Sequence, residues 1–160
     1  MLLIALLVYA TAMVAANLSI AAFGPSIAPV NAFVLIGLDL ALRDWLHVRL
    51  KPWQMLVLIG ATGLLTFALN PTAGRIAIAS ATAFTAAALV DWSVFARLRG
   101  SWPRRANGSN VAGAAVDSVL FLLLAPFPFS WVIAAQMLAA KVAGGAIWAW
   151  LLNRTMVRQL

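Results

Sequence analysis

Residues 2–22 read LLIALLVYATAMVAANLSIAA, a stretch without a single charged side chain. A helix needs about 20 apolar residues to cross roughly 30 Å of hydrocarbon. The stretch lacks the basic residues that begin a signal peptide, and its apolar character continues past any cleavage site made of small residues. These features predict a first membrane-spanning helix rather than a cleaved leader.

Five further apolar segments follow, and residues typical of turns separate them, as Pro103 and Gly108 separate the fourth segment from the fifth. We therefore expect an all-α integral membrane protein of about six transmembrane helices, forming one domain over residues 1–160. The second segment is the shortest and begins beside Pro29, which favours a tilted or partly re-entrant helix. The expected helices span residues 2–22, 28–42, 53–69, 74–95, 111–125 and 131–152.

The composition favours lipid as the solvent and excludes several classes of chemistry. Hydrophobic residues make up 64% of the chain and charged residues only 9%, with a mean hydropathy of +0.99. There is no cysteine, and the single His47 cannot build a metal cluster. Phosphate-binding loops and known catalytic motifs are missing, and the four aspartates form no paired motif. We expect no cofactor, no metal and no enzymatic activity.

The basic residues predict how the chain lies in the membrane. The formal net charge is +7, but Lys and Arg lie in the loops between apolar segments, so we expect a lipid bilayer and not a nucleic acid as partner. Alternate loops carry nearly all of them, and Arg75 alone lies near a loop of the other set. Both termini are therefore predicted to be cytoplasmic, in a multi-pass protein of the cell membrane. A homo-oligomer is compatible with the sequence.

Two charged residues lie near the middle of their predicted helices, where a charge costs about 2.5–3.5 kcal/mol to insert. These are Asp117 and Lys141. Asn110, Gly113, Ala114 and Asp117 recur at spacings of three and four, which places a small and polar stripe on one helix face. Two interpretations stay open: a cavity in which the pair binds a substrate or a coupling proton, or a structural ion pair that joins two helices.

Other polar residues are weaker candidates. Asp39 and Arg43 lie four residues apart and can pair at the membrane edge, and Asp91 precedes two arginines and is interpreted as organising their loop. Arg75 lies where a basic residue is unexpected, which favours a functional or inter-helix role. The amides of Asn17 and Gln136 can bind a heterocycle or a neighbouring helix equally well.

Several of these segments resemble the queuosine precursor transporter family, also called the vitamin uptake transporter family. The matching stretches are residues 31–47 (NAFVLIGLDLALRDWLH), 75–80 (RIAIAS), 91–99 (DWSVFARLR) and 109–121 (SNVAGAAVDSVLF), together with the last helix and its lysine. The resemblance implies a six-helix importer of 7-deazaguanine bases, such as 7-cyano-7-deazaguanine, salvaged for tRNA modification. It also implies an architecture similar to the substrate-binding membrane subunits of energy-coupling-factor vitamin transporters.

The same resemblance implies ligand contacts at Asp39, Arg43, Arg75, Asn110, Asp117 and Lys141. A guanine-like edge offers N–H donors to a carboxylate, such as Asp117, and a carbonyl to Arg75 or Lys141. The chain is shorter than many family members, which allows a narrower or altered substrate range. A capture subunit that needs a partner ATPase, and a purely structural membrane protein, remain the alternatives.

Overall fold

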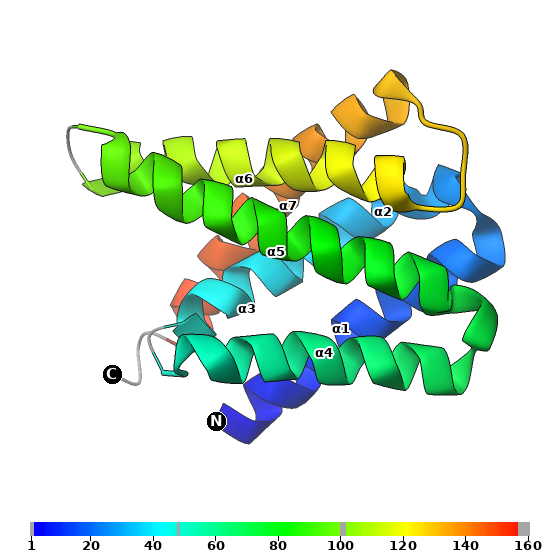
Figure 1. The fold of residues 1–160 in the computed structure, drawn as a ribbon. Helices are drawn as coiled ribbons and strands as arrows, with labels where there is room; N and C mark the ends of the chain where they lie inside the picture. The colour runs from blue at the N-terminus through cyan, green and yellow to red at the C-terminus, as the bar shows by residue number, and fades with distance from the viewer. Residues whose placement is uncertain (1, 48, 100–101, 157–160) are drawn as a thin grey trace.

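The computed structural model describes residues 2–47, 49–99 and 102–156, and every regular element among them is helical (Figure 1). This confirms the all-α prediction. The order is α1 (Leu2–Phe23), η1 (Pro25–Ile27), α2 (Ala28–Asn31), the π-helical η2 (Ala32–Ile36), α3 (Gly37–His47), α4 (Pro52–Leu69), η3 (Pro71–Ala73), α5 (Gly74–Arg97), α6 (Trp102–Leu124) and α7 (Trp131–Met156).

The second predicted segment forms a continuous helical run. η1, α2, η2 and α3 follow one another without a break from Pro25 to His47. Pro29 occupies one of the first two positions of α2, where its missing N–H breaks no helical hydrogen bond. The run carries a π-helical segment, a feature that is frequent at functional sites.

The prediction for the fifth helix was wrong at its start, because α6 begins at Trp102 and not at residue 111. Pro103 is the second residue of α6, where proline is tolerated because the first N–H groups have no partner inside the helix. Gly108 also lies within α6. Both residues were interpreted as separators from their type alone.

The surface is that of a membrane protein. Four stretches are long and apolar enough to span a membrane, namely Leu2–Phe23, Pro25–Leu42, Pro71–Asp91 and Trp131–Leu152, and Trp53–Leu69 and Gly108–Leu124 are shorter apolar helices. Many large apolar side chains are exposed, whereas several polar residues within the helices are buried, among them Asn17, Asn31, Asp39 and Lys141. That distribution suits a lipid environment, in which outward polar groups would lack partners.

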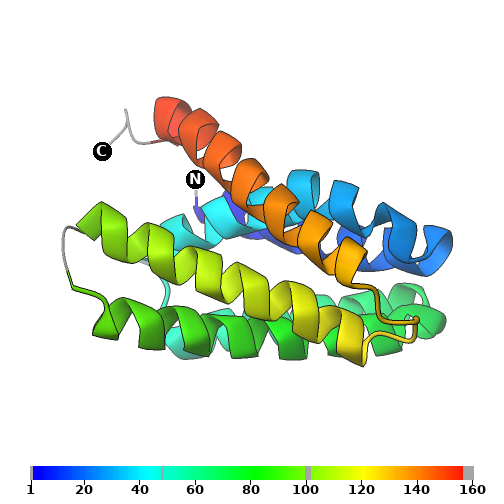
Figure 2. The same ribbon diagram turned by 90° about the horizontal axis from the view of Figure 1, so that it is seen from above.

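The chain runs back and forth between two ends of the bundle. One end, called here the basic end, holds the start of α1, the α3–α4 and α5–α6 connections and the end of α7 (Figure 1). The other, called the opposite end, holds η1, η3 and the α6–α7 connection. α5 and α6 lie antiparallel along their length, whereas α6 and α7 converge at the opposite end and diverge toward the basic end (Figure 2).

Glycines allow α3 and α7 to cross with their backbones in contact. A Cβ added at Gly37 would lie 2.7 Å from the backbone carbon of Gly144, and one added at Gly144 would collide with the carbonyl of Phe33 in the π-helical segment. Such close crossings are typical of small residues in membrane helices. Because Lys141 precedes Gly144 by three residues, the crossing fixes the height at which the lysine lies.

Apolar packing closes the bundle toward the opposite end. A buried cluster there includes Ile20, Ala28, Phe121, Leu122 and Met137, with Phe127 and Phe129 of the α6–α7 connection packed against it. A second buried cluster, around Tyr9, Met13, Leu42, Leu46 and Met55, joins α1, α3 and α4. Neither cluster fills the space between the diverging parts of α6 and α7.

Candidate functional site

A buried ion pair joins α6 to α7. The Lys141 Nζ lies 2.6 Å from Asp117 Oδ2 and donates a second hydrogen bond of 3.1 Å to Ser118 Oγ. The Ser118 hydroxyl in turn donates to the carbonyl of Ala114, at 2.7 Å. Lys141 is 2% exposed and Asp117 is 17% exposed, so the lysine is enclosed while the carboxylate is partly open to its surroundings.

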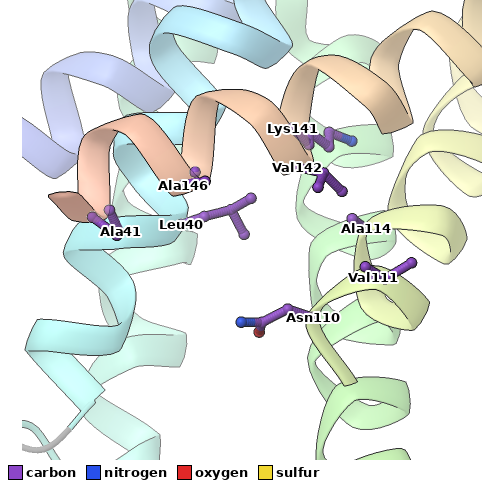
Figure 3. Close-up of a pocket in the computed structure, with 10 residues that line it drawn as sticks. Leu40, Ala41, Asn110, Val111, Ala114, Lys141, Val142 and Ala146 are labelled. Atoms are coloured by element: carbon purple, nitrogen blue, oxygen red, sulfur yellow. The ribbon is translucent and has the colours of Figure 1, made fainter. Parts of the chain in front are cut away.

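A cavity of about 240 Å³ lies beside this pair, where α6 and α7 diverge (Figure 3). Most of its wall is aliphatic, and Asn110 and Lys141 supply its polar side chains. Asn110 points into the space between α6 and the α3–α7 unit. The lining residues come from α3, α6 and α7: Leu40, Ala41, Asn110, Val111, Ala114, Lys141, Val142, Gly145, Ala146 and Ala149.

A smaller cavity of about 30 Å³ lies on the other side of the ion pair, next to the apolar cluster at the opposite end. Asp117 and Lys141 belong to its wall, together with Asn17, Asn31 and Ser80. Asn31 is held by two hydrogen bonds from its Nδ2, to the Ala16 carbonyl at 3.2 Å and to Ser19 Oγ at 2.7 Å. The ion pair therefore stands between a larger space toward the basic end and a narrow polar space beyond it.

A third cavity of about 10 Å³ connects the same residues to α5. Its wall contains Asp91, Asn110, Gly113, Asp117 and Lys141. α5 and α6 approach closely here, since a Cβ added at Gly113 would lie 3.2 Å from both the Ala87 carbonyl oxygen and the Asp91 Cβ. Glycine at position 113 thus allows the polar residues of the two helices to share one small space.

Four of the candidates predicted from the sequence come together at this site. Asp117 and Lys141 form the ion pair, Asn110 lines the cavity of about 240 Å³, and Asn17 lines the cavity beyond the pair. The predicted stripe on α6 is also observed, because Asn110, Gly113, Ala114 and Asp117 all line the smallest cavity.

The remaining candidates lie elsewhere. Asp39 is fully buried in α3 but lines none of the three cavities, and the side chain of Arg43 lies outside the described part of the structure. Arg75, at the start of α5, and Gln136, on α7, are exposed and also lie outside the three walls. Arg75 therefore lines none of the cavities that Lys141 lines.

Sequence reasoning missed several polar residues of the site. Asp91 was interpreted as organising a loop, yet it lines the smallest cavity with Asn110 and Lys141. Its position six residues before the end of α5 was a usable signal, because an aspartate within a spanning helix usually faces a partner or a cavity. Ser80, Asn31 and Ser118 carried no comparable signal, since small polar residues are common in membrane helices.

Asp117 and Lys141 can exchange their contact with each other for contacts with a ligand, so that neither charge is left without a partner. A ligand that offers N–H donors to Asp117 and an acceptor to Lys141 would replace the contact between the two side chains with two contacts of its own. Among the described residues, no group of three His, Cys, Asp or Glu side chains could hold a metal ion. The chemistry available here is recognition of a polar ligand within an apolar wall, which is typical of small-molecule sites.

Comparison with protein families gives the identity of the chain. The model of a family described as "Putative vitamin uptake transporter" matches residues 1–157. The chain belongs to the vitamin uptake transporter family. No curated protein and no solved structure matches it significantly. Family membership and the apolar helices together indicate a multi-pass membrane protein of a transporter family.

Proposed function

We propose that this vitamin uptake transporter imports queuosine precursors, 7-deazaguanine bases such as 7-cyano-7-deazaguanine, for tRNA modification. The observation that carries the proposal is the Asp117–Lys141 pair, which lines two small cavities, while Lys141 also lines the cavity of about 240 Å³ between α6 and α7. Family membership supplies the transport activity, and the resemblance of segments 75–80, 91–99 and 109–121 to queuosine precursor transporters supplies the substrate class.

The polar groups fit the edge of such a base. The ring N–H and the exocyclic amino group of a 7-deazaguanine point in the same direction, so that one carboxylate accepts from both. Asp117 is that acceptor, and Lys141 then donates to the ring carbonyl, with Asn110 as a second donor or acceptor. This assignment gives Lys141 the role that the sequence left open between Lys141 and Arg75.

The dimensions of the site fit a flat and mostly apolar molecule. Sites for drug-sized ligands occupy about 300–1,000 Å³, and a bicyclic base is smaller than those ligands, so the cavity of about 240 Å³ suits it. Leu40, Val111 and Val142 provide an aliphatic wall against which a planar ring can lie. The ring edge would then meet Asn110 and Lys141, and it would reach Asp117 by displacing the contact between Asp117 and Lys141, because Asp117 lines the two smaller cavities and not this one.

The basic end is proposed to be cytoplasmic, in the cell membrane, because eight of the eleven Lys and Arg residues belong to the described segments in or near its loops. With α6 and α7 diverging toward that end and apolar packing closing the other, this conformation faces the cytoplasm. Import would require a second conformation in which the opposite end opens, as alternating access about a central site demands.

The proposal is tested in cells that cannot synthesise queuosine precursors. Expression of this chain alone should restore queuosine in tRNA at limiting 7-cyano-7-deazaguanine. The Asp117→Asn variant should insert into the membrane at the normal level and restore none, because an amide offers one acceptor atom where the carboxylate offers two. Normal restoration by the variant would contradict the site, and restoration only with a partner ATPase would favour a capture subunit.

The ligand edge gives a second test. An analogue that lacks the exocyclic amino group keeps one donor for Asp117 instead of two. Losing one hydrogen bond to a charged group costs about 1.5–3 kcal/mol, so competition by the analogue should be weaker by about 10- to 150-fold. Equal competition by both compounds would show that Asp117 does not accept from this edge.

A further inference from the structure

The wall of the small cavity between α5 and α6 contains two carboxylates and one cation. Asp91 and Asp117 both line it, and Lys141 is the only basic residue in its wall among the described residues. Lys141 is already bonded to Asp117 at 2.6 Å. The buried Oδ1 of Asp91 has no hydrogen-bond partner in the described part of the chain. The site is therefore short of one positive charge.

No other described charge near the cavity compensates Asp91. On α5 itself, Arg97 donates from Nη1 to the Ser93 carbonyl at 3.1 Å and is absent from the wall. α3 contributes Leu40 to the wall, while its buried Asp39 is not part of it. α4 contains no charged residue, and the side chains of Arg43, Arg104 and Arg105 lie outside the described part of the structure.

The surroundings of Asp91 suit a small cation. Asp91 is partly buried and its Oδ1 is enclosed. A carboxylate with an enclosed oxygen and no counterion is expensive in the low-dielectric interior of a membrane protein. The space of about 10 Å³ is close to the volume that one water-sized particle needs. Asn110 and Asp117 add oxygen atoms to the same wall, and oxygen ligands are those that hard cations prefer. One monovalent cation is enough to offset the single unmatched carboxylate.

The geometry points to Asp91 as the binding site of a monovalent coupling cation, a proton or Na⁺, that enters with the substrate. This inference rests on the proposed function and adds its energy source. With a proton, the Asp91 carboxylate takes H⁺ from water on the outer side and returns it to water on the inner side. With Na⁺, the carboxylate and the neighbouring oxygens coordinate the ion for the same part of the cycle.

The position of Asp91 explains how cation and substrate would be coupled. The cation at Asp91 and the substrate at Asp117 share Asn110 and Lys141 as neighbours. A cation beside Asp91 offsets the negative charge of that carboxylate. Lys141 then has one carboxylate fewer to neutralise, so it is free to contact the substrate carbonyl. Because the two ligands favour the same arrangement of Lys141, each raises the affinity for the other, and that reciprocity is what coupled transport requires.

The test uses the purified chain in liposomes with labelled 7-cyano-7-deazaguanine and the membrane potential clamped at zero. An inward gradient of H⁺ without Na⁺, or of Na⁺ at equal pH, should drive accumulation of the wild type. With one cation per substrate, a tenfold gradient supports about tenfold accumulation. Asp91→Asn should accumulate no substrate above equilibrium but still exchange internal for external substrate. Asp91→Glu should recover gradient-driven uptake, and Thr82→Ala, an exposed change on α5, should behave as the wild type.

Every other result contradicts either the coupling site at Asp91 or the proposed function. Exchange by the wild type without accumulation under either gradient overturns the coupling site while leaving the proposed function intact. Accumulation by Asp91→Asn, or loss of exchange in that variant when it is folded, also overturns the coupling site. No exchange by the wild type overturns the proposed function. The cation site is then judged without substrate, by the infrared band of a protonated carboxyl or by ²²Na⁺ binding, either of which must be present in the wild type and lost in Asp91→Asn.

Discussion

The cost of isolating a charge in the membrane interior governs the behaviour of Asp117 and Lys141. Removing one partner of a buried ion pair costs about 3–5 kcal/mol, whereas replacing both by apolar residues of similar size is often neutral or stabilising. Lys141 is the more enclosed of the two, and Ser118 offers it only a weak alternative acceptor. A role in ligand recognition therefore explains the pair better than a gain in stability does.

This argument predicts different outcomes for single and double replacements. Lys141→Met should lower the free energy of unfolding in detergent by about 3–5 kcal/mol, because Asp117 then lacks its cation. The double variant Asp117→Leu with Lys141→Met should regain most of that stability and still fail to transport. A stable double variant that transports normally would reduce the pair to a structural role.

The position of the site along the bundle axis depends on the contact at which α3 and α7 cross. Gly37, Gly144 and the Phe33 carbonyl meet without intervening side chains, and Lys141 lies one turn from this contact. The π-helical segment η2 lies on the α3 side of the same crossing. A side chain inserted here would push α7 away from α3 and move Lys141 relative to Asp117.

We expect Gly144→Ala to destabilise the protein by about 1–3 kcal/mol, the usual cost of overpacking, and to reduce substrate uptake. Gly60→Ala is the matched control, because a Cβ at Gly60, on α4, meets no atom within 4 Å. Alanine is the better helix former, so this control should be neutral or slightly stabilising. Equal shifts in the thermal unfolding temperatures of the two variants would show that the crossing is not tightly packed.

The sequence predicted the helices well, because long apolar runs identify membrane spans almost directly. The prediction of helix bounds failed where a residue type occurs both within helices and in the turns between them. Pro103 and Gly108 break helices in many settings but are tolerated in α6, and nothing in the pattern distinguishes the two cases. The site was predictable where a charge lay deep in a span, as with Asp117 and Lys141. It was not predictable for Ser80 and Asn31, whose places depend on how the helices pack.

The asymmetry of the bundle follows from how its helices diverge. α6 and α7 meet near the connection at residues 125–130 and separate toward the basic end (Figure 2). The cavity of about 240 Å³ is lined by residues of both helices and of α3. The apolar cluster around Phe121 and Met137 closes the opposite end. With the excess of Lys and Arg at the open end, the bundle has the shape and charge distribution expected of the proposed importer with that end in the cytoplasm.

The orientation can be tested directly because the chain contains no cysteine. Single cysteines at Ser26 or Thr72, both exposed at the opposite end, should react with a membrane-impermeant maleimide in intact cells. A cysteine at Arg99, exposed at the basic end, should react only after the cells are opened. The reverse pattern would place the termini outside and contradict the proposed direction of access.

Direct binding of 7-cyano-7-deazaguanine to the purified protein tests the central claim, that the Asp117–Lys141 pair recognises the substrate. The wild type should bind, and Asp117→Asn should bind at least about 30-fold more weakly, since truncating a buried charged partner costs about 2–5 kcal/mol. Gln136→Ala is the control, because Gln136 lies on α7 with Lys141 but is exposed and outside the three cavities. Equal affinities for the wild type and Asp117→Asn, or a loss confined to Gln136→Ala, would contradict the account.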